Sequence, residues 1–136
     1  MSMEENKALI RKFLDELYNN GNLSVADEII ASPMLRESMK KAVSTARRML
    51  SNVQVKVEDM VAENDKVVAR CLISGTFTRS LLGVTLTNRS IETSYIGIYR
   101  IDNNQIKGYW FLGEPLLLMR QMGIWTFVLF FAGAFR

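Results

Sequence analysis

The sequence predicts one α+β domain, residues 1–136, in which N-terminal helices pack inside a curved antiparallel sheet. Two observations support this prediction. Apolar residues recur with the period of a helix up to about residue 50, and from Asn52 onward they alternate with the period of a strand. Turn residues then divide the second half into about four long strands. Helices followed by consecutive strands are typical of an α+β domain.

The first half of the chain is predicted to contain three helices. The first spans residues 4–20 and ends before Gly21, because glycine is common just past a helix C-terminus. Its apolar face is formed by Leu9, Ile10, Phe13, Leu14 and Leu17. Ser24 is predicted to cap a short second helix, with Asp27 at the capping-box position. A third helix, residues 33–50, carries a broad apolar stripe.

The second half is predicted to form a meander of strands. Val53, Val55 and Val57 alternate with polar residues and begin the first strand. Turn residues at 64–65 precede the segment KVVARCLISGTFT, and a glycine-containing loop at residues 82–88 leads to IETSYIGIYRI. A tight turn at residues 102–104 precedes QIKGYWFL. These four segments account for the predicted sheet.

Composition excludes several classes of chemistry. The chain has no histidine and one cysteine, Cys71, so Ser-His and Cys-His nucleophiles, histidine metal sites and an intrachain disulfide are excluded. The net charge of +3 is spread along the chain, which does not favour nucleic-acid binding. The start of the sequence has no apolar signal core, and a free cysteine suits a reducing compartment, so a cytoplasmic protein is expected.

Residues 124–136, IWTFVLFFAGAFR, form the most apolar part of the chain. A membrane-spanning helix needs about 20 apolar residues, and extending this run toward Leu116 includes Arg120 and Gln121. The tail is therefore predicted to close a cavity or to become buried in a dimer interface. Shallow insertion into a membrane surface is the alternative.

Glu114 is the one acid in the largely apolar segment YWFLGEPLLLMRQMG, residues 109–123. If the last strand is uninterrupted, alternation places Glu114 on one face with Ile106, Trp110 and Leu112. An enclosed apolar site would raise the pKa of this carboxyl and suit it to proton transfer near neutral pH. The alternative is an acid at a helix N-terminus, because Pro115 follows it.

Three further residues are candidates for catalysis or binding. Arg70 shares a strand face with Leu72, Ser74 and Thr76, where it would stabilise an oxyanion inside the fold or form an ion pair on the surface. Glu92 shares a face with Ser94, Ile96 and Ile98, as a second acid or a solvated strand end. Tyr109 can donate a phenolic hydrogen bond, but uninterrupted alternation sends it to the face opposite Glu114. A bulge would be needed to bring both side chains inward.

Five segments, in this order, resemble the SnoaL-like branch of the nuclear-transport-factor-2-like superfamily, which includes polyketide cyclases. They are EENKALIRKFLDELYNNGNLSVADEII, VEDMVAENDKVVARCLISGTFT, LLGVTLTNRSIE, IGIYRIDNNQIKGYW and LLLMRQMG. The resemblance implies a cone, which is a strongly bent sheet folded over helices around an apolar pocket. It also implies a homodimer.

The resemblance implies a site as well. The cyclases of this family use a carboxylate after a His-Trp pair on the last strand as general acid or base in an intramolecular aldol closure. Segment matching places Glu114 on that carboxylate, Trp110 on the tryptophan and Tyr109 on the histidine. Phe77 stands where relatives have a second histidine. A weaker similarity to limonene-epoxide-hydrolase-like enzymes places Arg70 on their arginine.

The function expected from these residues and from the resemblance is a cofactor-independent cyclase or isomerase of natural-product biosynthesis. It would transfer protons on an apolar polyketide-like or terpenoid-like intermediate, with Glu114, Arg70 and Tyr109 as catalytic residues. The expected substrate-binding residues are Trp110, Leu72, Ser74, Glu92, Ile96, Ile98, Phe77 and Met119. No cofactor or metal is expected. The alternatives are an epoxide-opening hydrolase or cyclase, for which Leu72 replaces one needed acid, and a non-catalytic protein that binds a small molecule in the cone.

Overall fold

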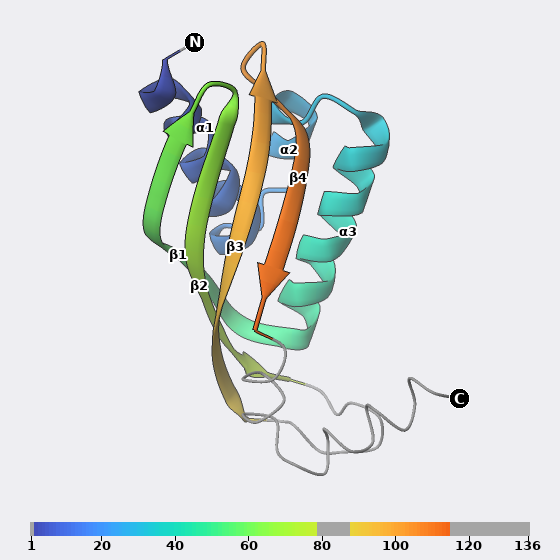
Figure 1. Cartoon of the computed structure of the whole chain (residues 1–136). Helices are drawn as coiled ribbons and strands as arrows, with labels where there is room; N and C mark the ends of the chain where they lie inside the picture. Colours follow the sequence, from blue (N-terminus) through green and yellow to red (C-terminus); the bar gives the residue numbers. More distant parts are fainter. Residues whose placement is uncertain (1, 79–87, 115–136) are drawn as a thin grey trace, which may run out of the picture.

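The computed structural model describes residues 2–78 and 88–114, and its elements follow the predicted order of helices and then strands (Figure 1). The helical part comprises α1 (Met3–Phe13), the π-helical segment η1 (Leu14–Asn19), α2 (Val25–Ile29) and α3 (Pro33–Met49). The strands are β1 (Leu50–Glu63), β2 (Lys66–Phe77), β3 (Ser90–Asp102) and β4 (Gln105–Gly113). The predicted α+β class is confirmed. The expectations for Pro115, Met119 and the tail at 124–136 lie outside the described residues.

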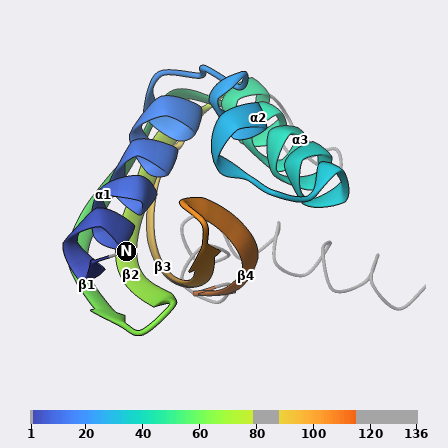
Figure 2. The ribbon, with the colours of Figure 1, turned by 90° about the horizontal axis from the view of Figure 1, so that it is seen from above.

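The four described strands form an open sheet in the order β1-β2-β3-β4, and each neighbouring pair is antiparallel. The sheet is strongly curved. In the view from above, α1 lies along the inner side of β1 and β2, and β4 curls back toward α2 and α3 (Figure 2). This arrangement matches the expected bent sheet folded over helices. It gives the sheet an inner face toward the helices and an outer face away from them.

The inner face carries the odd-numbered residues of β2 and β3. Val67, Ala69 and Cys71 of β2 are buried there, as are Tyr99 and Ile101 of β3. They pack against apolar side chains of α1, η1, α2 and α3, chiefly Leu9, Ile10, Phe13, Leu14, Leu17, Ile29, Met39 and Val43. A second, smaller cluster consists of Leu50, Val53, Phe77 and Ile91. The even-numbered residues of both strands therefore lie on the outer face.

The first predicted helix changes its winding before it ends. It is α-helical from Met3 to Phe13, where the Ser2 hydroxyl caps it by accepting from the Glu5 amide at 3.0 Å, and it continues as η1 to Asn19. Gly21 ends the helical path as predicted, with a φ of 70°. A Cβ at this glycine would lie 2.7 Å from Arg47 Nε, so glycine also leaves space for that side chain. The guanidinium of Arg47 in turn donates to the backbone carbonyl of Tyr18.

Asn19, at the end of η1, hydrogen bonds through its side chain to backbone groups of the edge strand β1. Its side-chain nitrogen donates to the Val55 carbonyl at 3.1 Å, and its side-chain oxygen accepts from the Val55 amide at 2.7 Å. The side-chain amide of Asn19 thus makes the two hydrogen bonds that a neighbouring strand would make with β1. Each is expected to contribute about 0.5–1.5 kcal/mol. Because an unpaired strand edge invites association with other chains, this contact also protects β1.

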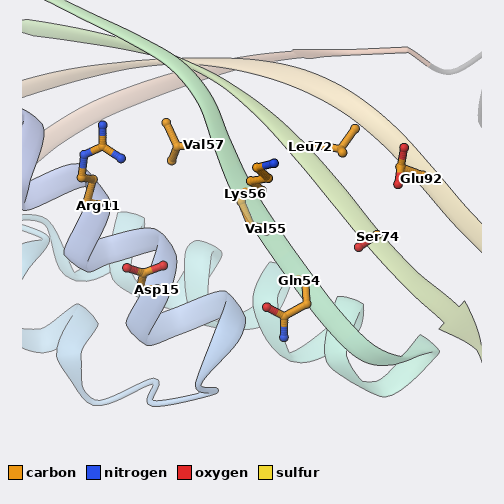
Figure 3. Close-up of a pocket in the computed structure, with 9 residues that line it drawn as sticks. All are labelled: Arg11, Asp15, Gln54, Val55, Lys56, Val57, Leu72, Ser74 and Glu92. Atoms are coloured by element: carbon orange, nitrogen blue, oxygen red, sulfur yellow. The ribbon is translucent and has the colours of Figure 1, made fainter.

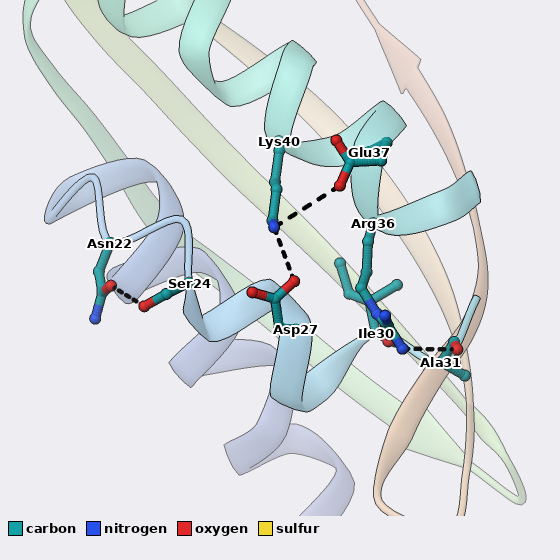
Figure 4. A network of polar contacts seen from close by, with 8 residues as sticks. All are labelled: Asn22, Ser24, Asp27, Ile30, Ala31, Arg36, Glu37 and Lys40. Atoms are coloured by element: carbon teal, nitrogen blue, oxygen red, sulfur yellow. Dashed lines mark hydrogen bonds and ion pairs between the residues drawn. The ribbon is translucent and has the colours of Figure 1, made fainter. Parts of the chain in front are cut away.

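Ser24 is the N-cap residue of α2 as predicted, but its side chain makes no capping hydrogen bond. Ser24 Oγ donates to Asn22 Oδ1 at 2.8 Å and makes no hydrogen bond to the α2 backbone (Figure 4). Asp27, expected at the capping-box position, instead accepts from Lys40 of α3 at 2.8 Å. Lys40 forms the centre of an ion-pair network that ties α2 to α3, because it also lies 3.8 Å from Glu37. Asp27 therefore bonds to the long side chain of Lys40 instead of forming the predicted capping box.

The third helix begins at Pro33 as predicted, with Ser32 as its N-cap. The Ser32 hydroxyl accepts from the Leu35 amide at 3.4 Å, and proline suits the first helical turn because it needs no amide partner there. The helix ends one residue earlier than predicted, since Leu50 already pairs with Phe77 in the sheet. Within the described residues, no helix is long and apolar enough to cross a membrane.

Candidate functional site

The inner face of β3 and β4 carries a cluster of aromatic side chains, which we call the inner tyrosine cluster. Its members are Tyr18, Tyr95, Tyr99, Tyr109 and Phe111. Phe111 lies at its centre, with ring centroids 5.9 Å from Tyr95, 5.8 Å from Tyr99 and 4.7 Å from Tyr109. Phe13 of α1 links Tyr18 and Tyr99 at 6.4 and 5.7 Å. Segments far apart in the sequence thus supply one surface of aromatic rings and phenolic hydroxyls inside the fold.

Two hydroxyls on the inner face of β3 are buried without a hydrogen-bond partner among the described residues. They are Tyr99 OH and Thr93 Oγ1. The whole Tyr99 residue is 0% exposed. A buried polar group without a partner costs about 1–3 kcal/mol, so such groups are uncommon in folded proteins. The Tyr99 ring lies over Gly97, where a Cβ would be 2.7 Å from its hydroxyl oxygen.

Burial keeps the phenols of Tyr18, Tyr95 and Tyr99 protonated. It raises the pKa of Tyr18 to about 12, and it raises the pKa of both Tyr95 and Tyr99 far above the ordinary value. The Cys71 thiol lies among them; burial raises its pKa, and a hydrogen bond to Tyr95 opposes that rise. At neutral pH these groups therefore act as neutral hydrogen-bond donors rather than as bases.

This burial predicts that the protein loses stability in alkaline solution. In the unfolded chain tyrosines release their protons near pH 10, whereas in the folded chain Tyr18 retains its proton until about pH 12. Between these values the unfolded state binds fewer protons, so the free energy of unfolding falls as pH rises, by up to about 1.4 kcal/mol per pH unit for each such group. Urea unfolding at pH 8, 9.5 and 11 measures the slope. A flat profile would contradict the burial of the phenols.

A bulge in β4 determines which side chains of that strand face inward. Ile101 pairs with Ile106, but Arg100 pairs with Gly108, so Lys107 is an extra residue in β4. After the bulge, Tyr109 pairs with the inward-facing Tyr99, and its hydroxyl lies 3.3 Å from Ser38 Oγ of α3. The predicted candidate Tyr109 therefore lies in the inner cluster.

Because of this bulge, the residues on each face of β4 differ from those predicted. Ile106 was predicted to share a face with Trp110 and Leu112, but Ile106 is buried whereas Trp110 is 54% and Leu112 58% exposed. Trp110 pairs with Ile98 and Leu112 pairs with Ile96, and both partners are even-numbered residues of the outer face of β3. These apolar residues therefore lie on the outer face of the sheet.

Arg70, Leu72, Ser74 and Glu92 also lie on the outer face, because they are even-numbered residues of β2 and β3. Arg70 is exposed. Leu72, Ser74 and Glu92 line one side of a surface hollow of about 610 Å³ at the β1 edge, whose other side includes Arg11 and Asp15 (Figure 3). The structure therefore brings three predicted binding residues together. It places them away from the inner tyrosine cluster.

The remaining predicted residues are Phe77, Met119 and Glu114. Phe77 is buried in the smaller apolar cluster with Leu50, Val53 and Ile91. Met119 lies outside the described residues. Glu114 is exposed and directly follows Gly113, which pairs with Tyr95 at the end of β4. The expected enclosed apolar setting of Glu114 is therefore wrong, and its link to the inner tyrosine cluster is its place in the sequence directly after the residue that pairs with Tyr95.

Tyr95, Tyr99 and Cys71 are inner-face residues that were not among the predicted catalytic or binding residues. A signal for them was present, since odd positions of β2 read Val67, Ala69 and Cys71 while even positions include Arg70 and Ser74. The more apolar face of a half-buried strand usually turns inward. Among residues 2–78 and 88–114 there is no group of three His, Cys, Asp or Glu side chains that could hold a metal ion.

Comparison with known proteins identifies this architecture. The sequence matches the model of the SnoaL-like polyketide cyclase family over residues 8–122. Among solved structures, TsrD from Streptomyces laurentii has a TM-score of 0.79 and 25% sequence identity, covering 90% of this chain and 98% of that chain. A comparison with curated proteins found no significant match.

Two further structures share the fold at lower identity. IdmH from Streptomyces antibioticus has a TM-score of 0.77 and 21% identity, covering 87% of this chain and 98% of that chain. A SnoaL-like polyketide cyclase from Agrobacterium tumefaciens has a TM-score of 0.76 and 14% identity, covering 90% of this chain and 100% of that chain. These two likenesses show the fold alone. Because the family match extends over most of the 136 residues, the chain belongs to the SnoaL-like polyketide cyclase family.

Proposed function

We propose that the protein is a cofactor-independent cyclase or isomerase that transfers protons on an apolar polyketide-like or terpenoid-like intermediate. Family membership supports a cyclase-type role. The observation that carries the proposal is the end of β4, where Gly113 pairs with Tyr95 and Glu114 follows directly. The carboxylate is thus one residue along the chain from a partner of the inner tyrosine cluster. A base and hydrogen-bond donors are the groups that enolate chemistry requires.

The proposed reaction is an intramolecular aldol closure. The Glu114 carboxylate removes a proton from a carbon beside a carbonyl group, and the resulting enolate carbon attacks a second carbonyl carbon of the same molecule. A carbon–carbon bond forms, one carbon–oxygen π bond breaks, and the new alkoxide takes the proton back from Glu114. Isomerisation differs only in returning the proton to another carbon. Neither reaction needs an oxidant, a reductant or a consumed water molecule.

The inner tyrosine cluster has a separate role in this proposal. The hydroxyls of Tyr99 and Tyr109 donate hydrogen bonds to the oxygens on which negative charge develops, while Phe111 and the phenol rings hold the substrate in a folded conformation. Arg70, which is exposed on the outer face, has no part in it. We place the protein in the cytoplasm, because its buried Cys71 has a free thiol that suits a reducing compartment.

Product analysis tests the proposed function. The purified protein is incubated with a panel of linear and partly cyclised poly-β-keto esters, and products are compared with those of a protein-free reaction by mass spectrometry and ultraviolet absorption. Cyclisation or isomerisation gives a new product of unchanged mass, or one lighter by a water molecule after dehydration. Hydrolysis of an epoxide panel would instead add the mass of water. Binding of these compounds without any product above background would favour a non-catalytic binding protein.

We also propose that the chain forms a homodimer through the outer face of its sheet. Strand registers align Val61, Val68, Ile98 and Trp110 in one apolar row across all four strands. Val61 and Trp110 are more than half exposed, at 58% and 54%. Trp110→Glu is therefore expected to shift the protein toward the monomer in sedimentation-velocity experiments, because it would bury a charge in the interface. A native chain that is monomeric at all concentrations would contradict the proposal.

A further inference from the structure

Asn6 of α1 has a buried side-chain oxygen that lacks a partner. The residue is only 3% exposed. Its side-chain nitrogen donates to the backbone carbonyl of Asn64 at 3.5 Å, whereas its Oδ1 has no hydrogen-bond partner among the described residues. Buried polar atoms without a partner are costly and therefore uncommon in folded proteins. The Oδ1 atom of Asn6 is thus available to a ligand.

Asn6 lines a surface hollow of about 270 Å³ at one end of the fold. The other lining residues belong to the β1–β2 turn or lie at the β3–β4 turn: Asn64, Asp65, Ile101, Asp102 and Asn103. Both turns lie at the same end of the molecule as the start of α1 (Figure 1). The Ile101 amide donates to the Asp65 carbonyl at 2.7 Å, which holds the two turns together. Because Asn6 also bonds to Asn64, its amide group faces a hollow built by three segments.

Two carboxylates give this hollow a negative charge. Asp65 and Asp102 both line it, and both are exposed. Among residues 2–78 and 88–114, neither carboxylate forms an ion pair with a lysine or arginine side chain. Two acids beside a buried amide oxygen attract a cation. The residues that line the hollow offer carboxylate and amide oxygens but no thiol or imidazole, which favours a hard cation over zinc.

The arrangement of these oxygens favours calcium over magnesium. Calcium accepts about six to eight oxygen ligands in a flexible geometry, whereas magnesium requires a nearly ideal octahedron and loses its water molecules reluctantly. Here the ligands come from one helix and two turns, so a regular octahedron is not built in. The described residues contain no group of three acids that could hold a metal ion, so a site here depends on the amide oxygen as its third protein ligand.

We propose that this hollow binds a calcium ion through Asn6 Oδ1 and the carboxylates of Asp65 and Asp102, with water molecules completing the coordination. The ion neutralises the two acids and gives the buried amide oxygen a partner. It also ties the start of α1 to both turns, so its role is to stabilise the fold. Glu114 follows the opposite end of β4, so the proposed proton transfer does not use this ion.

Thermal unfolding with and without calcium tests this proposal, because a ligand that binds only the folded state raises the melting temperature. A site with two charged ligands is expected to have a Kd of about 10⁻⁴–10⁻³ M, so about 10 mM CaCl₂ should raise the melting temperature by about 5–10 °C. NaCl of equal ionic strength measures the effect of charge screening alone and should give a smaller rise. MgCl₂ at the same concentration should also give a smaller rise than CaCl₂.

Three variants assign the effect to this hollow. Asp65→Asn combined with Asp102→Asn should abolish the calcium-dependent rise, because it removes both charges while asparagine still suits a turn. Asp59→Asn is the matched control, since it makes the same change at an exposed carboxylate of β1 outside the hollow, and it should keep the native rise. Asn6→Leu removes the amide oxygen and should weaken calcium binding about tenfold in isothermal titration calorimetry.

Several results would overturn the proposal. One is a rise with CaCl₂ that is no larger than the rise with NaCl or with MgCl₂. Another is an undiminished rise in the double variant of Asp65 and Asp102, and a third is loss of the rise in Asp59→Asn. Because melting and calorimetry do not depend on turnover, these results are independent of the Glu114 mechanism.

Discussion

Glu114→Gln is expected to lower kcat for ring closure by about 10²–10⁴-fold while the fold and the ligand affinity change little. This range is typical for the loss of a general acid or base. Glutamine keeps the size of the side chain and its ability to hydrogen bond, but it cannot accept and return a proton. Because Glu114 is exposed just after β4, the substitution leaves no buried group unpaired. Turnover of the cyclised product, circular dichroism and ligand affinity are the three measurements required.

Two further variants sharpen this test. Glu63→Gln removes an exposed carboxylate at the far end of β1 and should leave kcat within about twofold of the native value, as surface substitutions away from a site usually do. Glu114→Asp retains the proton-transfer group on a shorter side chain, so it should retain more activity than Glu114→Gln. If Glu114→Gln keeps more than half of the native kcat, the proton transfer belongs to another group.

The phenols of the inner tyrosine cluster cannot replace Glu114 as the base. Burial raises the pKa of Tyr18 to about 12 and raises the pKa of Tyr95 and of Tyr99 far above the ordinary value, so a phenolate at these three residues is rare at neutral pH. Because the sequence has no histidine, the proposal gives the carboxylate and the phenols separate roles. In the proposed mechanism, the acid moves the proton and the phenols stabilise the oxygen that becomes negative.

The order of elements was predictable from the sequence because helices and strands have different periods. The third helix shows this well, since Ser32 and Pro33 mark its start and its period ends where β1 begins. The π-helical turns from Leu14 to Asn19 were not predictable in this way. They leave the apolar positions Leu14 and Leu17 buried, so the hydrophobic pattern looks the same as that of an uninterrupted α-helix.

The inward face of β4 could not be read from the sequence, because both faces of the strand are apolar. Tyr109 and Phe111 alternate with Trp110 and Leu112, and burial on either side is compatible with that pattern. The bulge at Lys107 determines which side chains of β4 point inward, because one extra residue exchanges the two faces of the strand after it. No residue type marks this bulge uniquely. The candidate Tyr109 was therefore placed inside, and Trp110 outside, only by the strand register.

Gly97→Ala is expected to lower the free energy of unfolding by about 1–3 kcal/mol, as overpacking of a filled core does. The new Cβ would lie 2.7 Å from the Tyr99 hydroxyl oxygen and 2.8 Å from Cε2 and Cζ of its ring. The ring cannot turn away easily, because Phe13 and Phe111 contact it from two sides. Gly97 has no positive φ, so alanine should otherwise fit the strand better than glycine. The steric clash therefore determines the sign of the effect.

Gly108→Ala is the matched control, because it makes the same chemical change in the neighbouring strand. A Cβ at Gly108 would meet only Arg100 Nε, at 4.0 Å, which is an ordinary van der Waals contact. This variant should be neutral or more stable by up to about 1 kcal/mol, since alanine reduces the freedom of the unfolded chain. Urea unfolding followed by circular dichroism compares the two variants. Equal stability would mean that Tyr99 does not lie over Gly97, and the oxygen-binding role assigned to its fixed hydroxyl would lose its geometric basis.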